Sequence, residues 1–255
     1  MSLQRISPAD LVVDDEQSFE TLAEYRALKS ALLRSECPFL VTSEADGEQS
    51  SRLLNLAYWD PAEFLEVLPE AALSADQFAH NALHYCGHRA LGAAACSVEG
   101  ILFVESIASA ADIYWLGRLL TEDPYAGFLE SQVPAMSEAA ESAGVAADEF
   151  AGLLQAAAAD PSAAFGALRR TLFDTAIALV NATSVDEADE VLRAEAEQPW
   201  SALRHHYALS NWVLFARING DKGAENDAVR SADKRLRESE DPMTDLASMW
   251  FPEAE

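Results

Sequence analysis

Residues 74–120, SADQFAHNALHYCGHRALGAAACSVEGILFVESIASAADIYWLGRLL, decide the fold of this chain. The stretch contains no proline and includes the most apolar helix-length run in the sequence. Ser74 and Gln77 have the spacing of a capping box, which predicts that a helix begins there and continues to about Ala95. Gly92 and the following small residues are expected to interrupt it before a second helix over residues 100–120.

The second helix is apolar on nearly all sides, which is typical of a helix in the middle of a bundle. A third apolar run, residues 199–219, shows the same property and is predicted to be one continuous helix. We therefore predict an all-α fold, an irregular multi-helix bundle of roughly eight to ten helices around the two very apolar helices 100–120 and 199–219. The chain 1–255 is expected to form a single domain, with a subdivision near 134–160 as the alternative.

Smaller segments give weaker signals. Residues 37–47 have a strand-like composition but no obvious partner, so they are expected to form an ordered loop. Residues 50–58 are predicted to be a short helix, and Asp60–Pro61 is expected to start another that ends at Pro69. The apolar run 243–251 is interpreted either as a docking peptide or as the final element of the core.

His80, His84 and His88 form a stripe at four-residue spacing on the first helix. Two histidines at i and i+4 lie over each other and can chelate one metal ion, whereas three span about 12 Å and cannot all bind the same ion. The Glu-x-x-His and His-Glu-x-x-His patterns are absent. The simpler interpretation of the stripe is a polar, partly solvated helix flank.

Glu105 and Asp112 share a face of the second helix with apolar residues. Buried carboxylates are costly unless they are paired or coordinated, so they indicate either local ion pairs or a site between helices. Seven residues separate them by about 10.5 Å, too far to hold one ion together. A metal site would combine His80 and His84, or His84 and His88, with Glu105 or Asp112 across the helix interface.

The net charge of -26 argues against nucleic acid or an anionic membrane surface as a direct partner, because phosphates would repel the protein. The acidic residues are spread along the chain, which indicates general solvation or adaptation to a high-salt environment. The three cysteines show no Cys-x-x-Cys spacing and are interpreted as reduced thiols. No secretion signal is recognised, so we expect a cytoplasmic protein.

These patterns leave three hypotheses for function. The first is a non-catalytic helical protein that binds a protein partner or forms a homo-oligomer. The second is a metal-dependent enzyme that uses non-haem iron, manganese or zinc, with a divalent ion as its cofactor. The third is a small-molecule site between helices lined by aromatic side chains, for which the candidates are Tyr114, Trp115, Tyr207 and Trp212.

Overall fold

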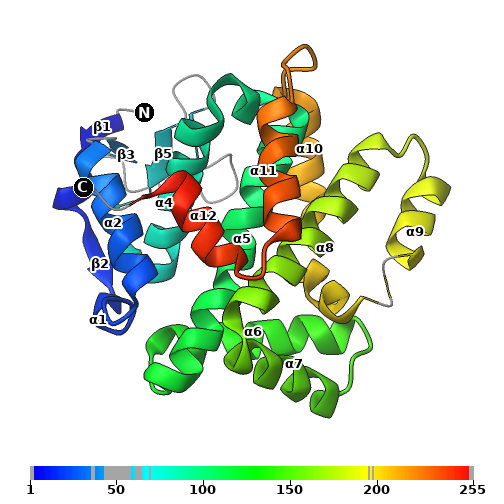
Figure 1. Cartoon of the computed structure of the whole chain (residues 1–255), viewed down its shortest axis with the longest axis horizontal. Coiled ribbons are helices and arrows are strands. Elements are labelled where there is room, and N and C mark those ends of the chain that lie inside the picture. Colours follow the sequence, from blue (N-terminus) through cyan, green and yellow to red (C-terminus); the bar gives the residue numbers. More distant parts are fainter. Residues whose placement is uncertain are drawn as a thin grey trace.

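The computed structural model describes residues 3–35, 38–42, 59–60, 65–68, 70–194, 196 and 198–252. Helices dominate this part of the chain, so the all-α prediction is confirmed (Figure 1). A single cluster of buried apolar side chains runs through it from Phe19 to Phe251.

The central element is α5, Val98–Glu122, which Figure 1 shows passing through the middle of the molecule. Its side chains are buried on all sides, as the apolar composition of residues 100–120 predicted. Its most extensive packing partner is α8, Pro161–Asn181. Phe103 of α5 makes an edge-to-face contact with Phe173 of α8, with ring centroids 5.3 Å apart.

α5 is also long and apolar enough to cross a membrane, but 89% of the window that meets this test is buried inside the protein. Burial to this extent is typical of a core helix.

The preceding helix, α4, spans Ala75–Leu91 and begins where the capping box predicted. The backbone N–H of Ser74 donates to Oε1 of Gln77 at 3.2 Å. Gly92 ends the helix with a φ of 57°, and a 3-10 turn over Gly92–Cys96 leads into α5. Glycine adopts a positive φ without steric cost, which explains the predicted interruption at this position.

The remaining helices surround α4 and α5. They are α1 (Glu16–Phe19), α2 (Ala23–Ser35), α6 (Gly127–Ser142), α7 (Ala147–Ala159), α9 (Val185–Ala194), α11 (Asp227–Glu238) and α12 (Pro242–Trp250). Asp160 and Asp241 cap α8 and α12, accepting from Ala163 N at 2.9 Å and from Thr244 N at 3.1 Å. The apolar run 243–251 lies in α12 and just beyond it, with Trp250 and Phe251 buried, so it is a core element and not an exposed peptide.

The prediction of an ordered loop over residues 37–47 was wrong for its first part. Phe39–Thr42 form strand β3, which pairs antiparallel with β1, Leu3–Ile6, and parallel with β5, Leu65–Leu68. Strand β4, Trp59–Asp60, completes the sheet order β1-β3-β5-β4, and β2, Val12–Asp14, pairs with β6, Ala72–Ser74.

Strand β5 also contradicts the helix predicted between Asp60 and Pro69. Parallel pairing with β3 buries Val67 and Leu68, and this long-range contact outweighs the local start signal. Residues 61–64 and 69, the predicted helix 50–58 and Cys37 lie outside the described residues.

The predicted continuous helix over 199–219 is broken. Residues Pro199–His205 form a 3-10 helix, η4, and α10 begins only at Leu209 and ends at Asn219. Ala208 between them has a left-handed φ of 48°. The bend lets η4 pack on α6 and α8 while α10 packs on α8 and α5. It also leaves Leu214 of α10 56% exposed.

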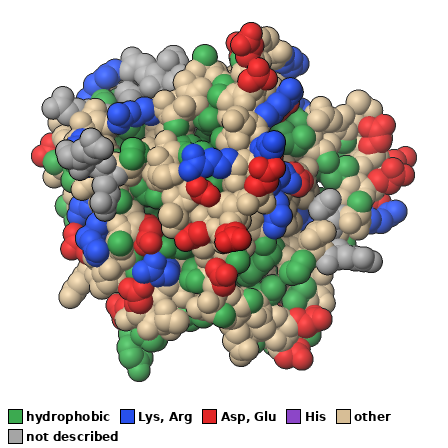
Figure 2. Space-filling view, in the orientation of Figure 1, with side chains coloured by type: hydrophobic (Ala, Val, Ile, Leu, Met, Phe, Trp, Pro, Cys, Tyr) green, Lys and Arg blue, Asp and Glu red, His purple; other side chains and the backbone are tan. Residues whose placement is uncertain are grey.

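Acidic and basic side chains alternate over the face shown in Figure 2, with no large patch of one sign. Several charged side chains of the protein pair, including Arg235 with Asp245 at 2.7 Å and Arg118 with Glu24 at 2.9 Å. This distribution matches the spread of acidic residues along the chain.

Candidate metal centre

Helices α4 and α5 pack against each other. This packing brings the histidine stripe of α4 close to the carboxylate of Glu105 on α5. Ala79, Ala82 and Cys86 on α4 are almost fully buried, and such small side chains allow a close approach between helices. His84 is only 7% exposed, so the stripe is not a solvated flank over its whole length.

Among the described residues, one group of potential metal ligands converges: His80, His84 and Glu105. One ligand atom from each lies within 4.8 Å of the others. Nε2 of His84 is 3.1 Å from Nε2 of His80 and 3.0 Å from Oε2 of Glu105. Nε2 of His80 is 3.8 Å from Oε1 of Glu105. The three side chains therefore present two nitrogens and a carboxylate to one small volume.

These separations can be compared with the geometry of a bound ion. Zinc–nitrogen bonds of 2.0–2.1 Å in a tetrahedral site place neighbouring ligand atoms about 3.3 Å apart. The observed distances of 3.0, 3.1 and 3.8 Å lie on both sides of that value. Small side-chain rotations would be enough to accept the ion.

The protonation states of His80 and Glu105 also suit a metal site. Burial, with a smaller contribution from His84, lowers the pKa of His80 to about 4, so its imidazole is neutral at neutral pH. Burial alone would raise the pKa of Glu105, but the charge and hydrogen bond of His84, followed by His80 and Ser109, lower it to about 2. A neutral imidazole and an ionised carboxylate are the forms that bind a metal ion.

One further contact orients the carboxylate. Ser109 donates from Oγ to Oε1 of Glu105 at 3.4 Å. Carboxylates that bind metal ions are themselves commonly hydrogen-bonded. This contact is supplied by the turn of α5 that follows Glu105.

The other two candidate ligands do not join the group. His88 lies one turn beyond His84, and burial, followed by the charge of His84, lowers its pKa to about 4. Asp112 lies two turns beyond Glu105, where burial and then the charges of Asp76 and Glu105 raise its pKa well above the usual range. Asp112 therefore favours its protonated form and is a poor cation ligand in this setting.

The aromatic residues expected to line a small-molecule site form two separate pairs. Tyr114 and Trp115 are buried in edge-to-face contact at 5.1 Å, and Tyr207 lies 6.4 Å from Trp212. A cavity of about 940 Å³ lies elsewhere, between α9 and α10, and none of these four residues lines it. The bend at Ala208, which helps to create that cavity, has no signal in the sequence.

No family model matches the chain, and no curated protein or solved structure shows significant similarity to it.

Proposed function

We propose that the protein binds a divalent transition-metal ion between α4 and α5 through His80, His84 and Glu105. The observation that carries this proposal is the convergence of the two Nε2 atoms and the carboxylate within 4.8 Å. Two imidazoles and one carboxylate suit zinc, ferrous iron and manganese, whereas calcium and magnesium prefer oxygen ligands alone.

Three protein ligands leave at least one coordination position for water or a substrate. Catalytic zinc sites and mononuclear iron sites share this property, while structural zinc sites are closed by four protein ligands. The proposal therefore extends to a metal-dependent enzyme. In that role the imidazoles would hold the ion, Glu105 would balance its charge, and the ion would act as a Lewis acid on the bound group.

A metal-free hydrogen-bonded cluster is the alternative explanation for the same contacts. In it, the Nε2–H of His84 donates to Oε2 of Glu105 and is shared with Nε2 of His80. The alternative explains the short distances but does not require a ligand. Metal content separates the two explanations directly.

The experiment is elemental mass spectrometry on the protein purified without chelators, in the wild type and three variants. His84→Asn and Glu105→Gln remove ligands, whereas His88→Gln removes the third histidine of the stripe and serves as the matched control. We expect about one equivalent of zinc, iron or manganese in the wild type and in His88→Gln, and a loss of most of it in the two ligand variants. Circular dichroism checks that each variant is folded. A metal-free wild type that also fails to bind added Zn²⁺, Fe²⁺ or Mn²⁺ would overturn the proposal.

A cytoplasmic location is part of this proposal. It is supported by Cys96, which is partly buried and is not in a disulfide, since reduced thiols suit a reducing compartment. A protein partner, or self-association, remains a prediction from the sequence.

A further inference from the structure

The cavity between α9 and α10 is the second feature of the molecule that suits a ligand. Its volume is about 940 Å³, at the upper end of the range for small-molecule sites. Its walls are the end of α8, helix α9, the turn before α10 and one face of α10. Figure 1 shows α9 at the edge of the molecule, separated from α10, and no residue of α9 is buried.

Apolar side chains make up most of the lining, and several remain open to solvent. Val185, Leu214 and Leu192 are 84%, 56% and 41% exposed. Leaving such side chains in water is unfavourable, and exposed apolar surface inside a concavity commonly marks a binding site. A hydrocarbon group would cover them.

The lining of the cavity is basic, whereas the protein as a whole is acidic. The chain has 43 acidic and 17 basic residues, yet none of the 15 described residues that line the cavity is Asp or Glu. Its ionisable lining residues are Arg204, His205 and Arg217. The basic side chains of the lining would favour an anionic group in this cavity.

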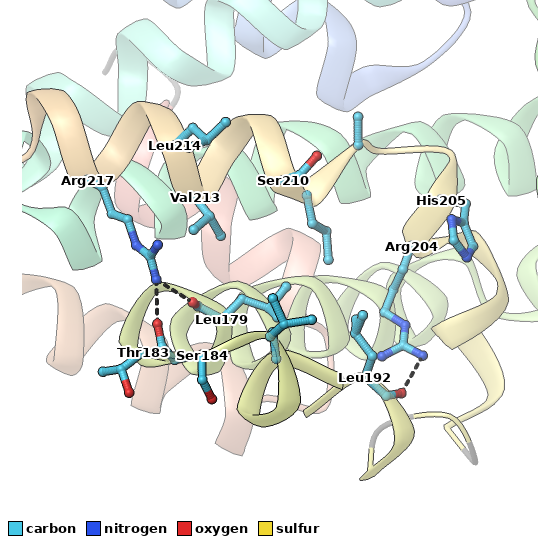
Figure 3. A pocket seen from close by; sticks show the side chains of 15 residues that line it. Leu179, Thr183, Ser184, Leu192, Arg204, His205, Ser210, Val213, Leu214 and Arg217 are labelled. Atoms are coloured by element: carbon cyan, nitrogen blue, oxygen red, sulfur yellow. Dashed lines mark hydrogen bonds between the residues drawn. The ribbon is translucent and has the colours of Figure 1, made fainter. Parts of the chain in front are cut away.

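Figure 3 shows how these groups are arranged. Arg204 and His205 lie at one end of the cavity, Arg217 lies at the other, and Leu179 and Val213 lie between them. The guanidinium of Arg217 contacts the C-terminal end of α8, where it donates hydrogen bonds to the carbonyls of Leu179, Val180 and Ala182. Arg204 donates to the carbonyl of Leu192, while His205 is exposed beside it.

We propose that this cavity binds an anionic amphiphile, with its hydrocarbon chain along the face of α10 and its carboxylate at the end formed by Arg204 and His205. From Leu209 to Arg217 the helix is about 12 Å long, enough to accompany a medium-length alkyl chain. This inference goes beyond the metal site and does not depend on it, because the lining includes neither His80, His84 nor Glu105.

The test uses isothermal titration calorimetry with dodecanoate below its micellar concentration, and dodecylamine as the cation of equal chain length. We expect dodecanoate to bind at one equivalent and dodecylamine to bind at least roughly tenfold more weakly. Shortening the acid by one methylene should weaken binding about fourfold, the effect of leaving one buried methylene in water.

Leu214 offers a matched pair of variants, because it is 56% exposed and lies in the middle of α10. Leu214→Glu and Leu214→Lys remove the same apolar group and use good helix formers, but they add opposite charges. Dodecanoate should bind Leu214→Glu at least roughly fivefold more weakly than Leu214→Lys. Val12→Glu makes an apolar-to-acidic change at a site 60% exposed on β2 and should leave the affinity unchanged.

Equal affinity for the two Leu214 variants, or no saturable binding of dodecanoate to the folded wild type, would overturn the proposal. Preferential binding of dodecylamine would also overturn it and would indicate a basic amphipathic partner in the same cavity. His84→Asn separates this result from the metal proposal, since it should lose the ion and still bind dodecanoate.

Discussion

Gly117 of α5 lies where α7 and α8 meet the central helix, and replacing it with alanine tests how close that contact is. Glycine in a helix interior usually destabilises the helix by about 1 kcal/mol relative to alanine. On propensity alone, Gly117→Ala should therefore stabilise the protein. The atoms around Gly117 predict the opposite, that Gly117→Ala lowers the free energy of unfolding.

A Cβ atom at Gly117 would lie 2.2 Å from the carbonyl oxygen of Ala157 and 3.2 Å from Cβ of Pro161. Carbon and oxygen atoms in contact are normally about 3.3 Å apart, so α7 would have to move by roughly 1 Å. Overpacking of this kind typically costs about 1–3 kcal/mol, and a rigid backbone carbonyl places the cost near the upper end. After the gain in propensity, we expect a net loss of about 2 kcal/mol, which lowers the Tm by roughly 4–8 °C for a chain of this size.

Gly152 of α7 provides the matched control, because it is also inside a helix but has no atom within 4 Å of an added Cβ. Gly152→Ala should stabilise the protein by about 0.5–1 kcal/mol. Urea unfolding followed by circular dichroism measures both variants. If Gly117→Ala is as stable as Gly152→Ala, the packing of α5 against α7 is looser than described and the reasoning fails.

Three further outcomes are expected. Zn²⁺ at a hundred times its Kd should raise the free energy of unfolding by about 2.7 kcal/mol and the Tm by roughly 5–10 °C, and thermal scans of Glu105→Gln should lack this shift. Burial lowers the pKa of His206 below its unfolded value of about 6.5, so the unfolded chain takes up the proton first and stability falls as the pH drops below 6.5. Urea titrations at pH 7 and 5 should show that His206→Gln loses less stability between the two pH values than the wild type does. An equal loss of stability in the two proteins would contradict the role given to His206. Arg169 is fully buried and its Nη1 donates to Asp233 at 2.7 Å, so Asp233→Asn should cost about 3 kcal/mol by leaving a buried charge unpaired. Arg169→Met removes the buried charge itself and should therefore destabilise the protein less than Asp233→Asn. If denaturant unfolding shows that Arg169→Met is the less stable variant, the argument is refuted.

The features that were predictable from the sequence are those with local causes. The start of α4 at Ser74 follows from side-chain capping, and the break at Gly92 follows from glycine conformation, although the helix was predicted to continue to about Ala95 and ends at Leu91. The central place of α5 follows from its apolar composition on all sides. The pairing of His80 with His84 follows from helical spacing alone.

Contacts between distant residues were not predictable in this way. Strand β3 depends on β1, about 35 residues earlier in the chain, and β1 itself is short and largely exposed. The left-handed turn at Ala208 is unfavourable for alanine and is selected by the packing of η4 and α10 on different neighbours.

Contacts between distant residues also determine whether Glu105 or Asp112 lies beside the histidines. Both residues share one face of α5, so sequence spacing treats them alike. The register of α4 against α5 sets Glu105 beside His84 and leaves Asp112 two turns away.

The composition of α5 has a consequence for how the chain is made. A newly synthesised segment of this length and hydropathy resembles one that the translocation machinery inserts into a membrane. An acidic residue such as Asp112 near the middle of such a segment opposes insertion by about 2.5–3.5 kcal/mol. Glu105 interrupts the same segment and opposes insertion in the same way.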